Sequence, residues 1–415
     1  MNVLRMSDRQ TAAVAIAGVA ALFVFGAGAG NADSSARATE PPGKSWKSLD
    51  PDMIGNVAPL LLSPQIQHPS AQKKIPLDAS ALTAPIAFAI VDALNLVAVL
   101  EARDGAVELR TMALDTGAVS EPVAKIAGAD RSFQLSSGLD GISVVVQPAR
   151  GKPIEVYDLK TRTRRASIAA AGESGGYSKF YVADASTLVA TTGDGKIQRW
   201  DLATGESKGS APIKAELNGG RFVPVACVGS TLVIGLPPSA GAGANAPITL
   251  LAVDIASGEV KAKKEVPSGP FSWSDGCDSL VLGSSAGGGW KDLRVIKVAS
   301  LESGQAQTMT PEISSVQSKL ARGGDLLLML EYMVNVIVVW DTTSGKPIAT
   351  MPAEVGGSAS FQVSRDGATL VSLSGPFVEG AIRPDHWEIY DLRTIQPKPA
   401  PTATPKANTS TPSTK

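Results

Sequence analysis

One short pattern recurs along the chain and constrains its fold more than any other feature. Each copy is a run of strand-forming residues, an aromatic or aliphatic residue, an aspartate, two further residues and then Ser or Thr, usually followed by Gly. The five clear copies place the aspartate at Asp158, Asp201, Asp254, Asp341 and Asp391. Two degenerate copies place Ala113 and Ser300 at this position when they are aligned by Gly117 and Gly304.

The spacing of these seven positions indicates the architecture. They lie 45, 43, 53, 46, 41 and 50 residues apart. A period of about 40 to 50 residues is typical of a β-propeller, in which each repeat forms one four-stranded blade. Valine, isoleucine and threonine also recur in short runs bounded by glycine, which favours many short strands. The sequence therefore predicts an all-β, seven-bladed β-propeller over residues 57–396.

Each aspartate of the pattern is expected to shape the turn that follows it. In the stretch Ile197–Glu206, the side chain of Asp201 can accept hydrogen bonds from turn amides, and Gly205 can adopt a positive φ. We therefore assign a structural role to the five repeat aspartates, which are Asp158, Asp201, Asp254, Asp341 and Asp391.

Three copies of the pattern resemble the Trp-Asp ends of WD40 repeats. They are RWDLATG at Arg199–Gly205, VWDTTSG at Val339–Gly345 and YDLRT at Tyr390–Thr394. The seven units cover nearly all of the chain outside its two ends, and the resemblance implies the same propeller fold. The chain departs from WD40 repeats because it has only two histidines, His68 and His386, and lacks the Gly-His dipeptide. Kinship with other seven-bladed families, whose blades end in LDxxTG, stays open.

The seventh blade needs a fourth strand to close the ring. The segment after its third strand reads IQPKPAP, and proline cannot donate a hydrogen bond to a sheet ladder. We expect Gln72–Asp78, which precedes the first blade, to pair there instead and to remove the exposed edge.

The N-terminus carries an apolar segment that is separate from the repeats. Arg5 and Arg9 precede Thr11–Gly30, an uncharged run that is long enough to span a bilayer as a helix. Residues 1–32 are therefore predicted to be a signal peptide or a membrane anchor. The small residues Gly30 to Ala32 fit a cleavage site, whereas the length of the run favours an uncleaved anchor with the propeller outside the cytoplasm.

The two segments that flank the propeller are polar and rich in proline. Residues 33–56 are predicted to form a linker, and the Pro/Thr-rich tail 397–415 is expected to be disordered. The protein is thus predicted to be exported, and to be either membrane-anchored or, if it is cleaved, secreted or periplasmic.

Binding residues are expected in the irregular loops, because loops on a rigid scaffold concentrate such residues. Insertions between the second and third strands of blades four, five and seven emerge on one face, at 236–247, 284–292 and 374–386. The side chains with recognition value there are Trp290, Phe377, Arg383, Asp385 and His386. The basic run Lys160–Arg165 is expected on the opposite face as a solvated turn.

Composition and motifs exclude several classes of function. The net charge of −1 gives no electrostatic footprint for nucleic-acid binding. Two histidines and two cysteines without CxxC spacing predict no metal site, and the sequence has no phosphate-binding loop. We therefore expect no metal and no cofactor.

We predict a monomeric propeller that serves as a protein-interaction scaffold in the cell envelope. Its partners are expected to be proteins, and the membrane is expected to contact only the N-terminal segment. The alternative is an extracytoplasmic propeller enzyme, such as a hydrolase, a lactonase or a quinoprotein-like enzyme, because single catalytic carboxylates carry no spacing signal.

The two cysteines occupy near-equivalent positions of adjacent blades. Cys227 follows the first strand of blade four, and Cys277 follows the first strand of blade five. In an oxidising compartment they are a candidate disulfide. Buried thiols are the alternative, since neighbouring blades do not guarantee the short Cα separation that a disulfide needs.

Overall fold

The computed structural model describes the repeat region with short gaps. The described residues are 57–77, 82, 85–103, 106–127, 133–149, 152–169, 177–217, 222–238, 243, 246–274, 276–284, 290–331, 334–352, 357–378 and 381–396. The segments 1–32, 33–56 and 397–415 lie outside this set, so the signal peptide or anchor, the linker and the disordered tail stay predictions. Among the described residues, no helix is both long enough and apolar enough to span a membrane.

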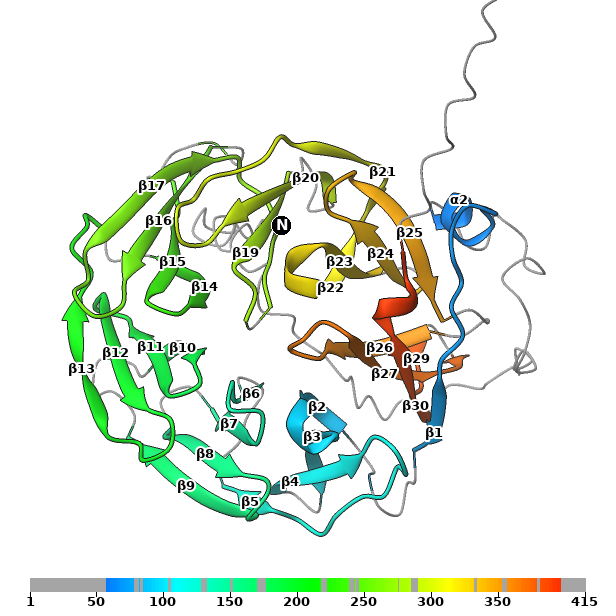
Figure 1. Cartoon of the computed structure of the whole chain (residues 1–415), viewed down its shortest axis with the longest axis horizontal. Helices are drawn as coiled ribbons and strands as arrows, with labels where there is room; N and C mark the ends of the chain where they lie inside the picture. Colours follow the sequence, from blue (N-terminus) through cyan, green and yellow to red (C-terminus); the bar gives the residue numbers. More distant parts are fainter. Residues whose placement is uncertain are drawn as a thin grey trace, which may run out of the picture.

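Seven four-stranded antiparallel sheets form a ring (Figure 1), which confirms the predicted seven-bladed propeller. In the first six blades the strands pair in sequence order. Blade one contains β2 (Pro85–Val91), β3 (Leu96–Arg103), β4 (Ala106–Ala113) and β5 (Ala124–Ile126). Blade two contains β6 (Gln134–Ser137), β7 (Ser143–Gln147), β8 (Ile154–Asp158) and β9 (Thr163–Ile168). Blade three contains β10 (Tyr177–Asp184), β11 (Thr187–Thr192), β12 (Lys196–Asp201) and β13 (Ser207–Pro212).

The next three blades repeat this arrangement. Blade four contains β14 (Val223–Val228), β15 (Thr231–Leu236), β16 (Ile248–Asp254) and β17 (Val260–Val266). Blade five contains β18 (Phe271–Ser272), β19 (Ser279–Ser284), β20 (Trp290–Lys297) and β21 (Gln307–Ile313). Blade six contains β22 (Ser315–Ala321), β23 (Leu326–Glu331), β24 (Ile337–Asp341) and β25 (Lys346–Met351).

The seventh blade draws on both ends of the described chain. Its strands pair in the order β26 (Gly357–Val363), β27 (Thr369–Gly375), β30 (His386–Asp391) and β1 (Lys73–Pro76). The connection from β27 to β30 adds a small hairpin of β28 (Phe377–Val378) and β29 (Ala381–Ile382). The short helices are α2 (Ala58–Leu61), η5 (Asp92–Leu94), η7 (Arg322–Gly324) and η8 (Leu392–Thr394).

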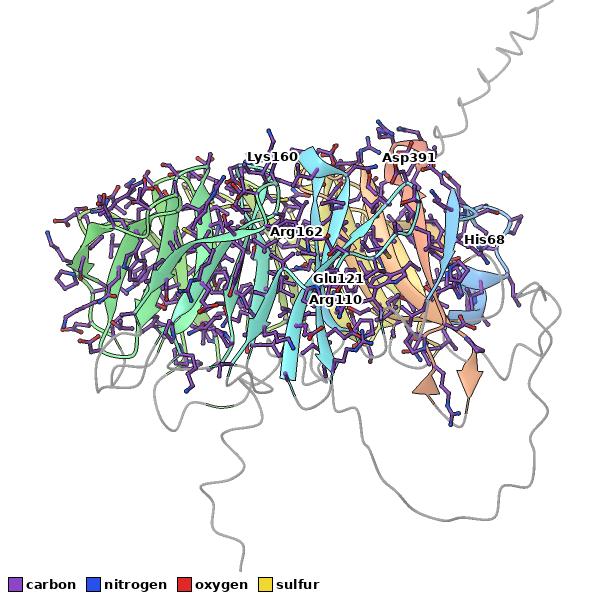
Figure 2. The ribbon with its side chains drawn as sticks, turned by 90° about the horizontal axis from the view of Figure 1, so that it is seen from below. His68, Arg110, Glu121, Lys160, Arg162 and Asp391 are labelled. Carbon is purple, nitrogen blue, oxygen red and sulfur yellow. The ribbon has the colours of Figure 1, made fainter. Side chains whose placement is uncertain are left out.

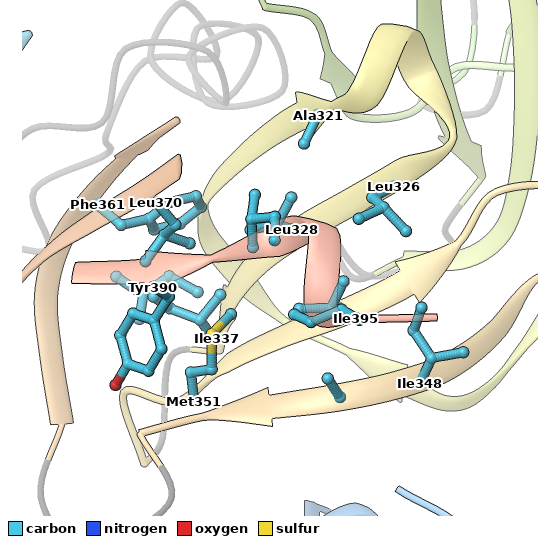
Figure 3. Packing of buried hydrophobic residues seen from close by; sticks show 14 residues of the cluster. Ala321, Leu326, Leu328, Ile337, Ile348, Met351, Phe361, Leu370, Tyr390 and Ile395 are labelled. Atoms are coloured by element: carbon cyan, nitrogen blue, oxygen red, sulfur yellow. The ribbon is translucent and has the colours of Figure 1, made fainter. Parts of the chain in front are cut away.

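The hydrophobic core is divided among the blade interfaces. Seven clusters of buried side chains in the described chain each join two adjacent blades, from the interface of blades one and two round to that of blades seven and one. Strands such as β15 and β23 are buried along their whole length, because each blade is covered on both faces by its neighbours. Figure 3 shows one such interface, where Leu328 and Ile337 of blade six pack with Phe361 and Tyr390 of blade seven.

The ring is closed as the sequence predicted. Strand β1 pairs antiparallel with β30 and places Ile75 opposite Trp387. The residues before β1 run along the outside of blade six, where Gln67 forms a parallel bridge with Ala349 of β25. We call residues 57–77 the N-terminal strap. It covers the outer edge of blade six and supplies the outer strand of blade seven, so the edge of blade seven is paired.

One repeat has a register that differs from the prediction. In blade three, the N–H of Asp201 donates to Glu206, and the N–H of Gly205 donates back to Asp201. In blade five the same two bonds are made by Lys297 and Leu301, so Lys297, and not Ser300, occupies the aspartate position. Leu301 has a φ of 58°, in the left-handed region where blade three uses Gly205. Burial of the Leu301 side chain between blades four and five offsets the strain of that conformation.

Candidate functional site

The hairpin β28–β29 lies on the face of the ring opposite the turns between third and fourth strands. Figure 2 shows Lys160 and Asp391 on one face and the two short strands of the hairpin projecting from the other. The basic turn at Lys160–Arg165 and the blade-seven insertion thus lie on opposite faces of the ring, as the sequence predicted.

The base of the hairpin is fixed by main-chain hydrogen bonds. The N–H of Arg383 donates to Pro376 at 3.0 Å, and the N–H of Asp385 donates to Ser374 at 3.0 Å. The N-terminal strap joins the same structure, because the N–H of Leu77 donates to the carbonyl of Asp385 at 2.7 Å. The base of the hairpin is thus bonded on one side to β27, through Ser374, and on the other to the N-terminal strap, through Leu77.

Two glycines allow the close approach of this segment. A β-carbon at Gly375 would overlap the carbonyl oxygen of Arg383, and one at Gly357 would overlap the side chain of Ile382. The hairpin base therefore packs against β26 and β27 at distances that only glycine permits.

A chain of ionisable side chains starts at the hairpin base and runs into the blade. Oδ1 of Asp385 lies 2.5 Å from Nδ1 of His386, and Nε2 of His386 lies 3.4 Å from Oε1 of Glu388. The hydroxyl of Tyr390 donates to Oε2 of Glu388 at 2.7 Å, and Nζ of Lys74 in β1 lies 3.3 Å from Oε1. Asp385 is exposed, His386 is half-buried and Glu388 is buried, so this row of side chains connects the surface with the interior.

These contacts shift the pKa values of the imidazole and of the buried carboxylate. The hydrogen bond to Glu388, aided by Asp385, raises the pKa of His386 above its ordinary value. Burial tends to raise the pKa of Glu388, but the hydrogen bonds from His386 and Tyr390 outweigh burial and hold this pKa below its ordinary value. The two shifts favour the charged form of both side chains.

A row of buried hydroxyl groups lines the neighbouring strands. The Oγ atoms of Ser358 and Ser372 are 2.7 Å apart, and those of Ser372 and Ser374 are also 2.7 Å apart. In the pairing of β27 with β30, Ser372 lies opposite Glu388 and Ser374 lies opposite His386. All three serines are buried, so this row gives the blade a polar interior rather than a surface for a substrate.

The structure brings together only some of the predicted binding residues. Arg383, Asp385 and His386 lie in one segment, with Arg383 and Asp385 exposed. Phe377 belongs to the same hairpin, where its backbone pairs with Ile382, while its side chain lies outside what the structure describes.

Trp290 is not a surface anchor, which corrects the prediction. It is the first residue of β20, it pairs with Ile313, and it is 2% exposed in the core between blades five and six. Its ring packs on Gly283 of the preceding strand, where a β-carbon would lie 2.6 Å from the indole. The glycine-rich sequence before Trp290 suggested a loop tip, but Gly283 provides the space that holds the ring inside.

Several residues of the site were missed in the sequence. They are Lys74, Ser372, Ser374, Glu388 and Tyr390. The signal was present in the strand His386–Asp391, where polar side chains alternate at His386, Glu388 and Tyr390 although both faces of a blade are covered. Only the ring closure shows that Lys74 joins them.

Structure comparison places the fold among known propellers. A chain in the crystal structure of a mitotic checkpoint complex is 15% identical, with 79% of this chain and 97% of that chain covered and a TM-score of 0.50. The C-terminal WD40 domain of Sif2 is 12% identical, with 79% of this chain and 85% of that chain covered and a TM-score of 0.48. The fold is a WD40-like propeller. Searches with the sequence alone match no protein family and no curated protein.

In this WD40-like propeller the repeat aspartates shape their turns, as predicted. Oδ1 of Asp201 accepts hydrogen bonds from the N–H groups of Ala203 at 2.9 Å and Thr204 at 3.0 Å. Asp158, Asp254 and Asp341 likewise each accept from two turn amides, and Asp391 accepts from one, the N–H of Arg393. Three of the five also pair with a cation seven residues later in the outer strand: Asp158 with Arg165, Asp201 with Lys208 and Asp254 with Lys261.

The two cysteines of the WD40-like propeller are buried thiols in the structure. Cys227 packs between blades three and four, and Cys277 packs between blades five and six. No disulfide joins Cys227 and Cys277, so the structure contains the alternative arrangement, two buried thiols.

Ionisable groups in the described part of the chain do not gather into a metal centre. No three His, Cys, Asp or Glu side chains there lie close enough together to hold an ion. Asp385, His386 and Glu388 form an ion-paired row at the base of the hairpin.

Proposed function

We propose that this WD40-like propeller is a protein-interaction scaffold and that the hairpin β28–β29 forms part of its binding face. The observation that carries the proposal is an inserted hairpin, held by main-chain hydrogen bonds on a rigid blade, with Arg383 and Asp385 exposed beside it. Binding residues concentrate on loops of this kind, and arginine is enriched among the residues that dominate interface energies.

The site favours a protein partner over a small substrate. The hydroxyl row and Glu388 are buried, so a small molecule would meet no open cluster of nucleophile and base at this place. The exposed groups instead offer one guanidinium and one carboxylate two residues apart in the chain, which suits a partner surface with complementary charges.

The test is site-specific crosslinking in the cell. A photo-reactive amino acid at position 383 should capture one protein, whereas the same group at position 160, exposed on the opposite face, should not capture it. The double variant Arg383→Ala, Asp385→Ala should then bind the captured protein about tenfold more weakly, as loss of one interface anchor predicts. Equal capture from both faces, or unchanged affinity of the double variant, contradicts the proposal.

We also propose that the scaffold works outside the cytoplasm, exported and held at the membrane by residues 11–30. The support is the uncharged run behind Arg5 and Arg9. The intact mass of the mature protein and its extraction from membranes at high pH test this separately. A mature chain that begins near Ala32 indicates cleavage and a secreted or periplasmic protein, and a full-length chain that extraction releases from the membrane contradicts the anchor.

A further inference from the structure

The sequence contains only two histidines, and both lie where the N-terminal strap meets the ring. Nδ1 of His68, on the strap, lies 2.7 Å from the hydroxyl of Thr350 in β25. His386, on β30, lies opposite Pro76 in the pairing of β30 with β1. Histidine is the side chain whose ordinary pKa puts its charge change between pH 5 and 8. Both histidine side chains, which ordinarily titrate in this range, thus lie at contacts between the strap and the ring.

His386 is surrounded by ionisable groups from two elements. Asp385 and Glu388 contact its two ring nitrogens from its own segment, and Lys74 of β1 contacts Glu388. From β27, the hydroxyl-bearing Ser374 lies opposite it. Further along β30, Tyr390 bonds to Glu388 and packs in the apolar cluster with blade six (Figure 3).

We propose that the N-terminal strap is a pH-sensitive clasp, which is closed when His386 is protonated and loosened when His386 is neutral. The imidazolium is shared between Asp385 and Glu388. When it loses its proton, the buried carboxylate of Glu388 keeps its charge but loses one of its two cationic partners, and an incompletely paired buried charge is costly.

This loss reaches the strap through two direct contacts. Lys74 of β1 is the cation that remains beside Glu388, and Leu77 donates its N–H to the carbonyl of Asp385. Strand β1 is only four residues long, so a change at these contacts affects a large part of its attachment.

The sign follows from the direction of the pKa shift of His386. A histidine whose pKa is raised by folding contributes stability that is fully present below its ordinary pKa. That contribution is lost as the pH rises through the raised value. The clasp is therefore closed below the ordinary pKa of histidine and loosens as the pH rises through the raised pKa of His386.

Hydrogen exchange of the full chain tests the clasp without any partner, so its outcome is independent of the proposed scaffold function. The amides of Gln72 and Leu77, which donate to Ile389 and Asp385, report the pairing of β1. Protection factors are measured at pH 6 and pH 9 and corrected for intrinsic exchange. In the wild type they should be lower at pH 9 than at pH 6, by about tenfold for each pH unit by which folding raises the pKa of His386.

Two variants at one position separate charge from packing. His386→Lys keeps a cation and should stay protected at both pH values, whereas His386→Gln should be weakly protected at both. His68→Gln, the control, should keep the wild-type pH profile. Wild-type protection that is the same at pH 6 and pH 9, or an equal fall in His386→Lys, overturns the proposal.

An NMR titration of the wild type gives a second test that does not depend on the folding of a variant. The imidazole signals of the two histidines are distinguished by comparison with His68→Gln. The midpoint of the His386 titration should coincide with the pH at which β1 loses protection, and separate midpoints overturn the proposal.

Discussion

The guanidinium group of Arg365 in blade seven donates a hydrogen bond to the main-chain carbonyl of Leu139 in blade two. The N–H of Arg365 donates to Asp92 of blade one at 2.9 Å. Its side chain also passes Gly276 of blade five, where a β-carbon would lie 3.3 Å from Nε. Arg365 of blade seven therefore bonds to blades one and two and also lies close to blade five.

Replacing Arg365 should loosen the whole ring. Arg365→Met removes a charged hydrogen bond between blades that are not neighbours, and we expect the free energy of unfolding to fall by about 1–2 kcal/mol. Thermal unfolding followed by circular dichroism measures the change. Arg383→Met is the matched control, because Arg383 is an exposed arginine in the hairpin, and an equal effect of both substitutions contradicts the cross-ring role.

The repeat aspartates make the propeller sensitive to acid. The hydrogen bond from Lys208 holds the pKa of Asp201 below its usual value, and Lys261 and Arg393 do the same for Asp254 and Asp391. A carboxylate with a lowered pKa contributes stability that is present above its unfolded pKa and is lost as the pH falls through the folded one. Stability should therefore decline progressively from about pH 5 downward, where chemical denaturation can follow it.

Asp201→Ala isolates one of these contributions. It should lower the melting temperature at pH 7, through the loss of about 1 kcal/mol from the turn hydrogen bonds. The difference from wild type should shrink as the pH falls through the lowered pKa of Asp201, because the side chain then becomes protonated in both states. Asp115→Ala, at an exposed turn of blade one, is the control and should leave the melting temperature unchanged. An unchanged melting temperature for Asp201→Ala at pH 7 argues against the structural role of the repeat aspartates.

The architecture could be predicted because its determinants are local. Asp201 and Gly205 specify a turn within five residues, and the copies of that turn reveal the period. Blade five escaped correct alignment because Leu301 takes the positive φ without glycine, and its burial depends on the contact between blades four and five. Trp290 was misplaced for a similar reason, since the space that Gly283 leaves for its ring is visible only in the fold.

The candidate site was predictable only where its residues are close in sequence. Asp385 and His386 are adjacent, but Lys74 joins them only through closure of the ring. Blade two has a related arrangement, in which Tyr157 donates to Glu155 and Glu155 pairs with Arg164 of the outer strand. Blade seven repeats this arrangement, and the N-terminal strap supplies the cation from β1.

The glycine at the end of β27 should control the position of the hairpin. Gly375→Ala places a β-carbon against the carbonyl of Arg383, so the hairpin base must move away from the blade. We expect faster hydrogen exchange at residues 381–385 and a destabilisation of about 1–3 kcal/mol. Gly243→Ala, in the blade-four insertion, is the matched control because a β-carbon there meets no atom within 4 Å. Unchanged exchange at the hairpin in Gly375→Ala contradicts the tight packing of its base.

Removal of the N-terminal strap should open the ring. Without residues 57–77, β30 becomes an exposed edge strand, and the interface of blades seven and one loses Ile75, which is 6% exposed there. We expect the truncated protein to aggregate or unfold, because an unpaired edge and an uncovered apolar interface both promote association. Size-exclusion chromatography and circular dichroism measure this outcome. A chain that lacks only residues 397–415 is the control and should remain a soluble monomer. A monomeric strap deletion with an unchanged melting temperature would show that β1 is not needed for closure.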